Sequence, residues 1–445
     1  MTSLENLGYR QELKRTLTVR DLIIYGMVFM VPISPFGVFG FVAKDAHGMV
    51  PLAYLVGLIG MFFTAMSYAS MSRAFPVAGS VYSYVGRGLH QAAGFMAGWL
   101  ILLDYILVPA LLYVFSTVAL RPLFPAVPDL VWLLSFVGFN ALVNLLGVHL
   151  TARVNLCVLA LELVALALFV VVGLVSLHGG QGAGALTLRP LYDPTVFSMA
   201  TVAGATSIAV LSFLGFDGIS TLAEESLGRD SVARATLASL LLVGALFVLQ
   251  TWIAADLAQG THFSSAETAF YEISQRAGGT GLRLAVVVAN IIASGIANAL
   301  AAQAAVSRIL YAMARDGRLP AVLARVHPRY RTPYVSILFV AVISIGIGLI
   351  FANRLDDLTR IVNFGALTGF LLLHVAVINY YVIRGRSRAW VRHLLMPLAG
   401  FAVLAYVLYE MDRAAQVMGA VWIALGVAYF AVLSLLLKKP AAIDL

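Results

Sequence analysis

The chain has 445 residues, of which 61% are hydrophobic and only 11% are charged. A soluble globular protein carries roughly 25% charged residues, so this composition excludes a soluble protein and indicates a polytopic membrane protein in contact with lipid. The net charge of +8 does not indicate nucleic-acid binding, because the basic residues gather in the segments on one side of the predicted membrane.

Twelve apolar segments are long enough to cross a bilayer, which takes about 20 helical residues. The predicted spans are 20–43, 50–72, 93–119, 129–148, 153–178, 196–223, 236–257, 282–310, 333–352, 358–383, 393–410 and 416–437. The segments between them are short, so residues 1–445 are expected to form a single transmembrane domain. The first twenty residues lack the apolar core of a secretory signal peptide.

Lysine and arginine predict the orientation, because they are enriched in cytoplasmic segments. With the N-terminus in the cytoplasm, 21 of the 29 basic residues fall in inside segments and 8 in outside segments. Both termini are therefore expected to be cytoplasmic, with the chain in the inner (plasma) membrane.

The first span is predicted to break near its middle, where Pro32, Pro35, Gly37 and Gly40 interrupt it. Proline removes an amide donor and clashes with the preceding turn, and glycine tolerates a non-helical backbone. A break at membrane depth is tolerated only inside the protein or beside a water-filled cavity.

The sixth span is predicted to break similarly at Ser212, Gly215, Asp217 and Gly218. Spans one and six are equivalent if two five-helix units repeat in inverted orientation, over about 20–178 and 196–384, with additional helices over about 391–437. Interrupted segments at matching places in two halves indicate a substrate site at the membrane midplane. The alternative is a pair of kinks accommodated by packing.

Three carboxylates fall deep inside spans: Asp104, Glu162 and Asp217. Every lysine and arginine falls at a span end or in a loop, so no fixed cation is expected beside them. An ionised acid near the bilayer centre costs several kcal/mol and usually marks a substrate, ion or proton pathway. Each acid is therefore expected to be protonated, hydrogen-bonded or paired with an arriving cation, which favours a cationic cargo.

The three acids have different alternatives. The position of Asp104 is equally consistent with a role in the substrate site and with a hydrogen bond between helices. Asp217 is favoured for the site because it falls at a helix break. Glu162 lies away from both breaks and is expected to carry a proton, since burial favours the neutral form of a carboxyl group.

Aromatic residues surround these acids in sequence, and an ammonium over an aromatic face gains about 0.5–2 kcal/mol. With 18 tyrosines and 25 phenylalanines in the chain, chance proximity is the alternative for each. These residues are Phe36, Phe39, Tyr105, Phe213 and Phe216.

The eighth span carries a polar stripe on one helical face, formed by Asn290, Ser294 and Asn298. The stripe either lines the cavity or bonds neighbouring helices. The single cysteine, Cys157, forms no intrachain disulfide, and no metal-ligand or cofactor motif is present in the sequence.

Three stretches carry a family resemblance: RAFPVAGSVYSYVGRGLHQAAGFMAGW (73–99), LSFLGFDGISTLAEE (211–225) and SRILYAMARDGRLPAVLARVHPRYRTP (307–333). They resemble the amino acid–polyamine–organocation superfamily of secondary transporters, an all-α integral membrane class with a LeuT-type 5+5 inverted repeat. The likeness covers nearly the whole chain. Within the superfamily, residues 98–110 and 361–386 look most like bacterial putrescine importers.

The resemblance implies a substrate site between the unwound parts of helices one and six, against helices three, eight and ten. Asp217 matches the place where related polyamine and agmatine carriers have an acid. Asp104 and Tyr105 match the importers' helix-three motif. Glu162 falls where some proton-coupled relatives have a lysine whose charge takes the place of a bound sodium ion. Some importers also have an acid in the helix-one break, where this chain has Gly37.

We therefore expect a proton-coupled importer of putrescine or a related small polyamine that works by alternating access. The rival hypothesis is a proton-coupled permease or exchanger for neutral or cationic amino acids. No enzyme motif and no channel selectivity filter is present in the sequence, and the oligomeric state is left open. The predicted substrate site comprises Pro32, Ser34, Phe36, Gly37, Asp104, Tyr105, Phe213, Phe216, Asp217, Ser294 and Asn298, with Glu162 and Asp217 as proton carriers.

Overall fold

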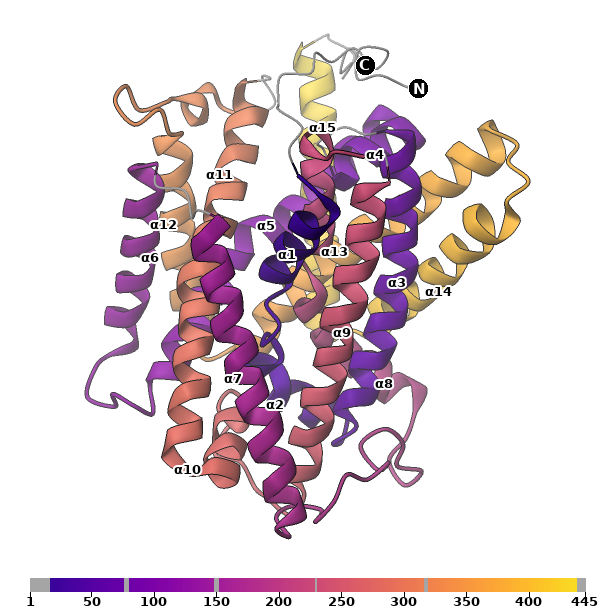
Figure 1. Cartoon of the computed structure of the whole chain (residues 1–445). Coiled ribbons are helices and arrows are strands. Elements are labelled where there is room, and N and C mark those ends of the chain that lie inside the picture. Colours follow the sequence, from indigo (N-terminus) through magenta and orange to yellow (C-terminus); the bar gives the residue numbers. More distant parts are fainter. Residues whose placement is uncertain (1–16, 76–79, 148–151, 229, 316–318, 438–445) are drawn as a thin grey trace.

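The computed structural model describes residues 17–75, 80–147, 152–228, 230–315 and 319–437 (Figure 1). Within these residues, nine helices are long and apolar enough to cross a membrane, and two bent helix pairs raise the number to eleven. The long helices are α3 (Val50–Ala74), α5 (Gln91–Leu120), α7 (Ala152–His178), α9 (Ser231–Ala258), α10 to α11 (Ala269–Arg315), α12 (Tyr334–Phe351), α13 with its π-helical end (Leu355–Arg384), α14 with its π-helical start (Val391–Tyr409) and α15 (Arg413–Leu437).

The predicted all-helical membrane architecture is confirmed, whereas the count of twelve spans stays a prediction. The helix in the position of the fourth predicted span, α6 (Asp129–Leu145), has only 17 residues. A short helix, α4 (Ser80–Gly88), precedes α5 at one end of the bundle. We refer to this end, at the top of Figure 1, as the α4 end.

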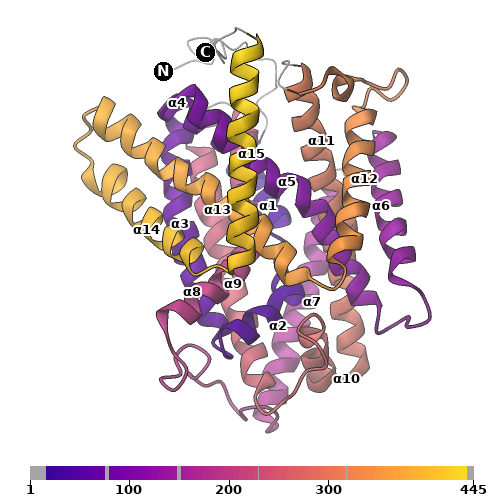
Figure 2. The same ribbon diagram turned by 180° about the vertical axis from the view of Figure 1, so that it is seen from behind.

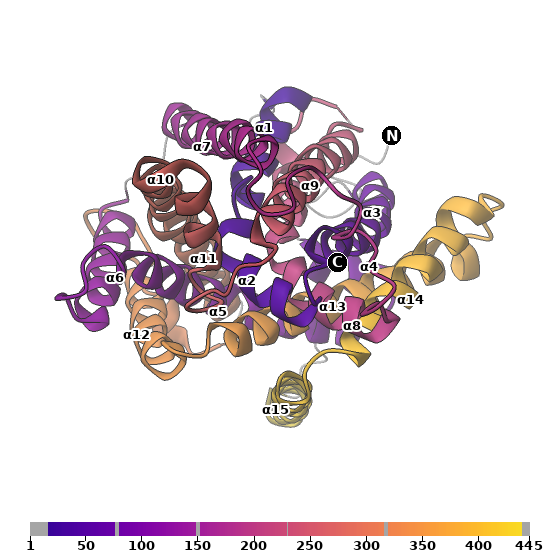
Figure 3. The ribbon, with the colours of Figure 1, turned by 90° about the horizontal axis from the view of Figure 1, so that it is seen from below.

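Helix α2 (Pro35–Asp45) lies near the centre of the bundle in the view from below, whereas α1 (Val19–Met30) packs against α9 and α7 (Figure 3). The last helix, α15, lies at the periphery (Figures 2 and 3). It is attached to α5 through Trp99 and Trp422, whose indole N–H groups each donate to the other residue's backbone carbonyl at 2.9 Å.

The first span breaks between α1 (Val19–Met30) and α2 (Pro35–Asp45), which are bent by 57°. Val31 has a φ of +51°, which L residues rarely adopt. Pro35 starts α2, where its missing N–H costs no helical hydrogen bond.

The predicted role of two glycines in this break was wrong, because Gly37 and Gly40 lie within helix α2. Close packing requires Gly40, because a Cβ there would overlap the backbone of Ala266. A Cβ at Gly37 would make only an ordinary contact with the ring of Phe115 at 3.5 Å, so packing does not require glycine there.

The sixth span breaks as predicted. Helix α8 (Met199–Ala209) passes into a 3₁₀ turn (Val210–Phe213) and, after Gly215, into a second 3₁₀ segment (Phe216–Glu225), with a bend of 41°. Gly215 has a φ of +112°, and a Cβ there would lie 2.8 Å from the carbonyl oxygen of Phe29 in α1. Glycine at this position therefore lets the two broken helices touch directly.

A third irregular segment was not predicted. Between α10 (Ala269–Asn290) and α11 (Ala299–Arg315), residues Ile291–Asn298 form a π-helix. Such π segments are rare and frequently occur at functional sites. This one contains Ser294 and Asn298 of the predicted polar stripe.

Candidate functional site

A cavity of about 100 Å³ lies where the irregular parts of the three helices face α5. Helix one supplies the residues around its break, helix six the turn at Gly215, and the π segment its polar stripe. The lining residues are Phe29, Met30, Val31, Ser34, Gly37, Asp104, Tyr105, Val108, Leu111, Leu112, Phe115, Leu211, Leu214, Gly215, Asp217, Gly218, Asn290, Ser294, Asn298, Ala302 and Ala305.

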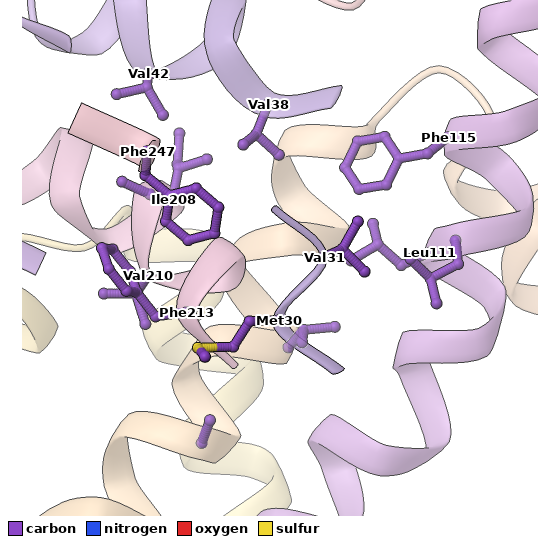
Figure 4. Packing of buried hydrophobic residues seen from close by; sticks show 14 of the residues in the cluster. Met30, Val31, Val38, Val42, Leu111, Phe115, Ile208, Val210, Phe213 and Phe247 are labelled. Atoms are coloured by element: carbon purple, nitrogen blue, oxygen red, sulfur yellow. The ribbon is translucent and has the colours of Figure 1, made fainter. Parts of the chain in front are cut away.

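The apolar part of the lining belongs to the packed core around the break. Figure 4 shows Met30 and Val31 of helix one with Leu111 and Phe115 of α5, and it shows Phe213 in the packing of buried residues nearby. The cavity thus has an aliphatic and aromatic wall on the α5 side.

Two carboxylates line this cavity. Asp217, at the start of the second 3₁₀ segment, accepts hydrogen bonds from the Gly215 N–H at 3.3 Å and from the Tyr68 hydroxyl at 3.5 Å. The Oδ1 atom of Asp104 on α5 is buried and has no partner among the described residues. No lysine or arginine is among the lining residues that the structure describes, so the cavity is negatively charged whenever either acid is ionised.

The structure brings seven of the predicted substrate-site residues into this lining. They come from the helix-one break, α5, the helix-six break and the π segment, which lie far apart in the sequence. These residues are Ser34, Gly37, Asp104, Tyr105, Asp217, Ser294 and Asn298.

Four predicted residues do not line the cavity. Phe36 packs away from it, with its ring 4.2 Å from that of Phe270. Phe213 packs edge-on against Phe247 at 5.2 Å. The other two are Pro32, a buried residue of the break, and Phe216, which packs against Tyr68 and Phe370.

Glu162 lies outside the cavity lining, in the middle of α7. Only 1% of its surface is exposed, and its Oε2 atom has no hydrogen-bond partner among the described residues. The role of Glu162 as a proton carrier stays a prediction.

Several apolar lining residues were missed at the sequence level. Val108, Leu111, Leu112 and Phe115 follow Asp104 on α5 at spacings of 4, 7, 8 and 11 residues. These spacings define one face of a helix. Helical periodicity starting from the acid therefore contains the signal for this wall.

The cavity continues toward the α4 end of the bundle. A second cavity of about 210 Å³ shares Phe29, Asn298 and Ala305 with the first. Its other lining residues include Tyr25, Asn155 and Arg308, from the middle of α1, the start of α7 and the second half of α11. The site thus connects with this end of the molecule.

Toward the opposite end, an ion pair ties three helices together. Arg360, near the start of α13, bonds Asp45 at the end of α2 and donates to the Ser207 hydroxyl of α8 at 3.4 Å. Arg360 is 8% exposed. The halves of helices one and six on this side are therefore joined to α13.

A helical membrane protein with a small cavity at paired helix breaks, and with a second cavity that shares its lining residues, has the features of the membrane transporter class. Comparison with protein families agrees: residues 27–435 match the amino acid permease family. The chain belongs to this family, within the amino acid–polyamine–organocation superfamily, and is a transporter and not an enzyme.

Characterised relatives match over nearly the full length. The chain is 30% identical to the low-affinity putrescine importer PlaP of Escherichia coli K12, over 97% of this chain and 96% of the importer. It is 27% identical to the branched-chain amino acid permease BcaP of Bacillus subtilis, over 94% and 93% of the two chains. A methylthioribose transporter of Bacillus subtilis is 24% identical over 94% of both chains.

Proposed function

We propose that the protein is a proton-coupled importer of putrescine or a related small polyamine that works by alternating access. The observation that carries this proposal is the pair of carboxylates, Asp104 and Asp217, in a cavity whose described lining has no basic side chain. A buried carboxylate that is ionised is stabilised by a cationic partner, because an unpaired charge in an apolar site is costly. A diamine brings two ammonium groups to two acids.

The size and lining of the cavity support a small substrate. A volume of about 100 Å³ is below the roughly 300–1,000 Å³ typical of sites for drug-sized ligands. Asp217 would pair with one ammonium group, while Asp104 and the hydroxyl of Tyr105 would bind the other. The similarity to a putrescine importer supports the same substrate class.

A neutral or cationic amino acid is the second candidate, and the wall formed by Val108, Leu111 and Leu112 favours it. Aliphatic side chains of this kind suit a branched apolar substrate. The similarity to a branched-chain amino acid permease supports this alternative. In that case one acid pairs with the α-ammonium group and the other remains protonated.

Uptake by purified protein in liposomes separates the two candidates. We expect labelled putrescine to accumulate when the outside is acidified, and excess leucine not to compete. Accumulation of leucine with no putrescine uptake would assign the amino acid function instead. Putrescine uptake that ignores an imposed pH gradient would contradict proton coupling.

Glu162→Gln is expected to abolish the response to the pH gradient. Glutamine has the shape and neutrality of the protonated acid but cannot release a proton. Gradient-driven accumulation should fall at least about 100-fold, the lower end of what loss of a proton-transfer group typically costs. Exchange of labelled for unlabelled substrate should persist, because it needs no net proton movement.

Glu410→Gln, at the end of α14, is the matched control and should keep the wild-type gradient response. A Glu162→Gln protein that still accumulates substrate in proportion to the pH gradient would exclude Glu162 as the proton carrier.

A further inference from the structure

Three helices that contribute no residue to the cavity lining each carry a carboxamide side chain with 0% exposed surface: Asn140 on α6, Gln250 on α9 and Asn363 on α13. Each carboxamide nitrogen donates to backbone carbonyls within, or directly before, one of the irregular segments that line the cavity. Because a carbonyl only accepts hydrogen bonds, these partners identify the nitrogen of each carboxamide.

Gln250 bonds the helix-one break. Its Nε2 donates to the carbonyl of Pro32 at 2.9 Å and to that of Leu246, one turn earlier in α9, at 3.0 Å. In a continuous helix the Pro32 carbonyl would accept from the Phe36 N–H. Here that N–H bonds Ile33 instead, at 2.9 Å. Gln250 therefore supplies the donor that the break has removed.

Asn140 makes the same arrangement at the π segment. Its Nδ2 donates to the carbonyls of Gly295 and of Phe136, one turn earlier in α6, both at 2.9 Å. In an α-helix the Gly295 carbonyl would accept from the Ala299 N–H. That N–H bonds the carbonyls of Ser294 and Ile296 instead, so the π geometry passes over Gly295.

Asn363 bonds helix six at the point where its α-helical geometry ends. Its Nδ2 donates to the carbonyls of Ser207 at 2.6 Å and Ile208 at 3.3 Å. Both carbonyls lie in the last turn of α8, directly before the 3₁₀ turn that starts at Val210. The three helices with irregular segments in the cavity lining therefore each receive a donor from an unbroken neighbouring helix.

The side-chain oxygens of the same three residues have no partner among the described residues. A buried acceptor without a partner destabilises a fold, so it is the donating nitrogen that these positions require. We propose that Asn140, Gln250 and Asn363 are positioning residues that hold the three broken segments in register around the cavity. This inference concerns the geometry of the site and does not depend on which substrate is carried.

Cysteine reporters test each contact separately. Cys157 is the only cysteine of the chain, so a Cys157→Ser protein can carry one reporter at a time. Ser34, Leu211 and Ser294 all line the cavity and report on helix one, helix six and the π segment. The measurement is the rate at which each reporter cysteine reacts with a positively charged methanethiosulfonate reagent in purified protein.

Each carboxamide is replaced by an apolar residue of similar shape: Gln250→Met, Asn363→Leu and Asn140→Leu. We expect each change to alter the labelling rate of its own reporter about fivefold or more, the size that loss of one hydrogen bond gives. The other two reporters should stay within about twofold, because independent sites behave additively. KM for transport should rise more than the maximal rate falls.

Gln416→Met is the matched control. The Nε2 of Gln416 also donates to two carbonyls, those of Leu408 and Tyr409, but at the end of α14 and outside the cavity lining. This change should lower thermal stability without altering any reporter.

Unchanged labelling at all three reporters, or equal changes at all of them, would overturn the proposal. Where an apolar variant does not reach the membrane, Gln250→Asn, Asn140→Gln or Asn363→Gln takes its place, since each moves the carboxamide by one methylene group. Wild-type labelling in these variants also overturns the proposal. Failure of the apolar and the carboxamide variants alike to fold would assign the residues to folding alone and overturn it too.

Discussion

Asp217→Asn is expected to weaken putrescine binding and uptake roughly 30-fold or more, because loss of one partner of a buried ion pair costs about 2–5 kcal/mol. The asparagine oxygen can still accept from the Gly215 N–H, which Asp217 bonds at 3.3 Å. The local turn is therefore kept while the charge is removed. Thermal shift with increasing putrescine measures binding, since a ligand that binds the folded state stabilises it.

Asp193→Asn provides the control for this change. Asp193 pairs with Arg189 in the segment between α7 and α8, outside the cavity lining, so its neutralisation should not alter putrescine binding. An Asp217→Asn protein that binds putrescine as tightly as the wild type would contradict the proposed site.

Arg360→Gln is expected to reduce uptake about tenfold or more by releasing the closure between α2, α8 and α13. Removing one partner of a fully buried ion pair costs about 3–5 kcal/mol. The 8% exposed Arg360 bonds both Ser207 and Asp45, whose side chain is 27% exposed, so the cost here should be smaller than that. The conformation in which Arg360 joins α2, α8 and α13 should lose stability relative to conformations in which these helices are apart. Uptake and thermal unfolding of the variant measure the effect.

A double-mutant cycle tests this pair. Asp45→Asn should act in the same direction, and the double variant should be little worse than Arg360→Gln alone, because both changes remove one shared interaction. Arg189→Gln, which removes the 66% exposed partner of Asp193, should change stability by less than about 1 kcal/mol. Additive losses in the double variant would show that Arg360 and Asp45 act independently.

The two helix breaks were predictable from the sequence, because proline and glycine directly change the backbone geometry of a helix. Pro32 and Pro35 predict a break in the first span, and Gly215 with Asp217 predicts one in the sixth. The position of Asp104 within a regular helix also places Tyr105, Val108 and Leu111 relative to it. The family resemblance agrees with the comparisons, which show the amino acid permease family.

The direction of side chains inside the breaks was not predictable. Phe36, Phe213 and Phe216 were expected in the site but pack against neighbouring rings. Periodicity assigns faces only to regular helices, and these residues lie within or directly beside non-helical backbone. Gly37 was also expected in the site, and it does line the cavity, from within helix α2.

The residues that bond the backbone at the breaks could not be predicted from the sequence, for a different reason. Asn140, Gln250 and Asn363 are isolated polar residues in apolar helices, and their partners are backbone carbonyls more than 150 residues away. Backbone acceptors carry no residue identity. Only the folded arrangement shows which polar side chain serves which break.

The contact of Gly215 with Phe29 has a consequence for how such a carrier changes shape. With a Cβ position only 2.8 Å from the Phe29 carbonyl, and with Gly218 against the ring of the same residue, the two interrupted helices leave no gap in which one can slide past the other. A tilt of α1 toward helix six must therefore push the turn of helix six with it. Such a movement also displaces Asp217, which follows that turn.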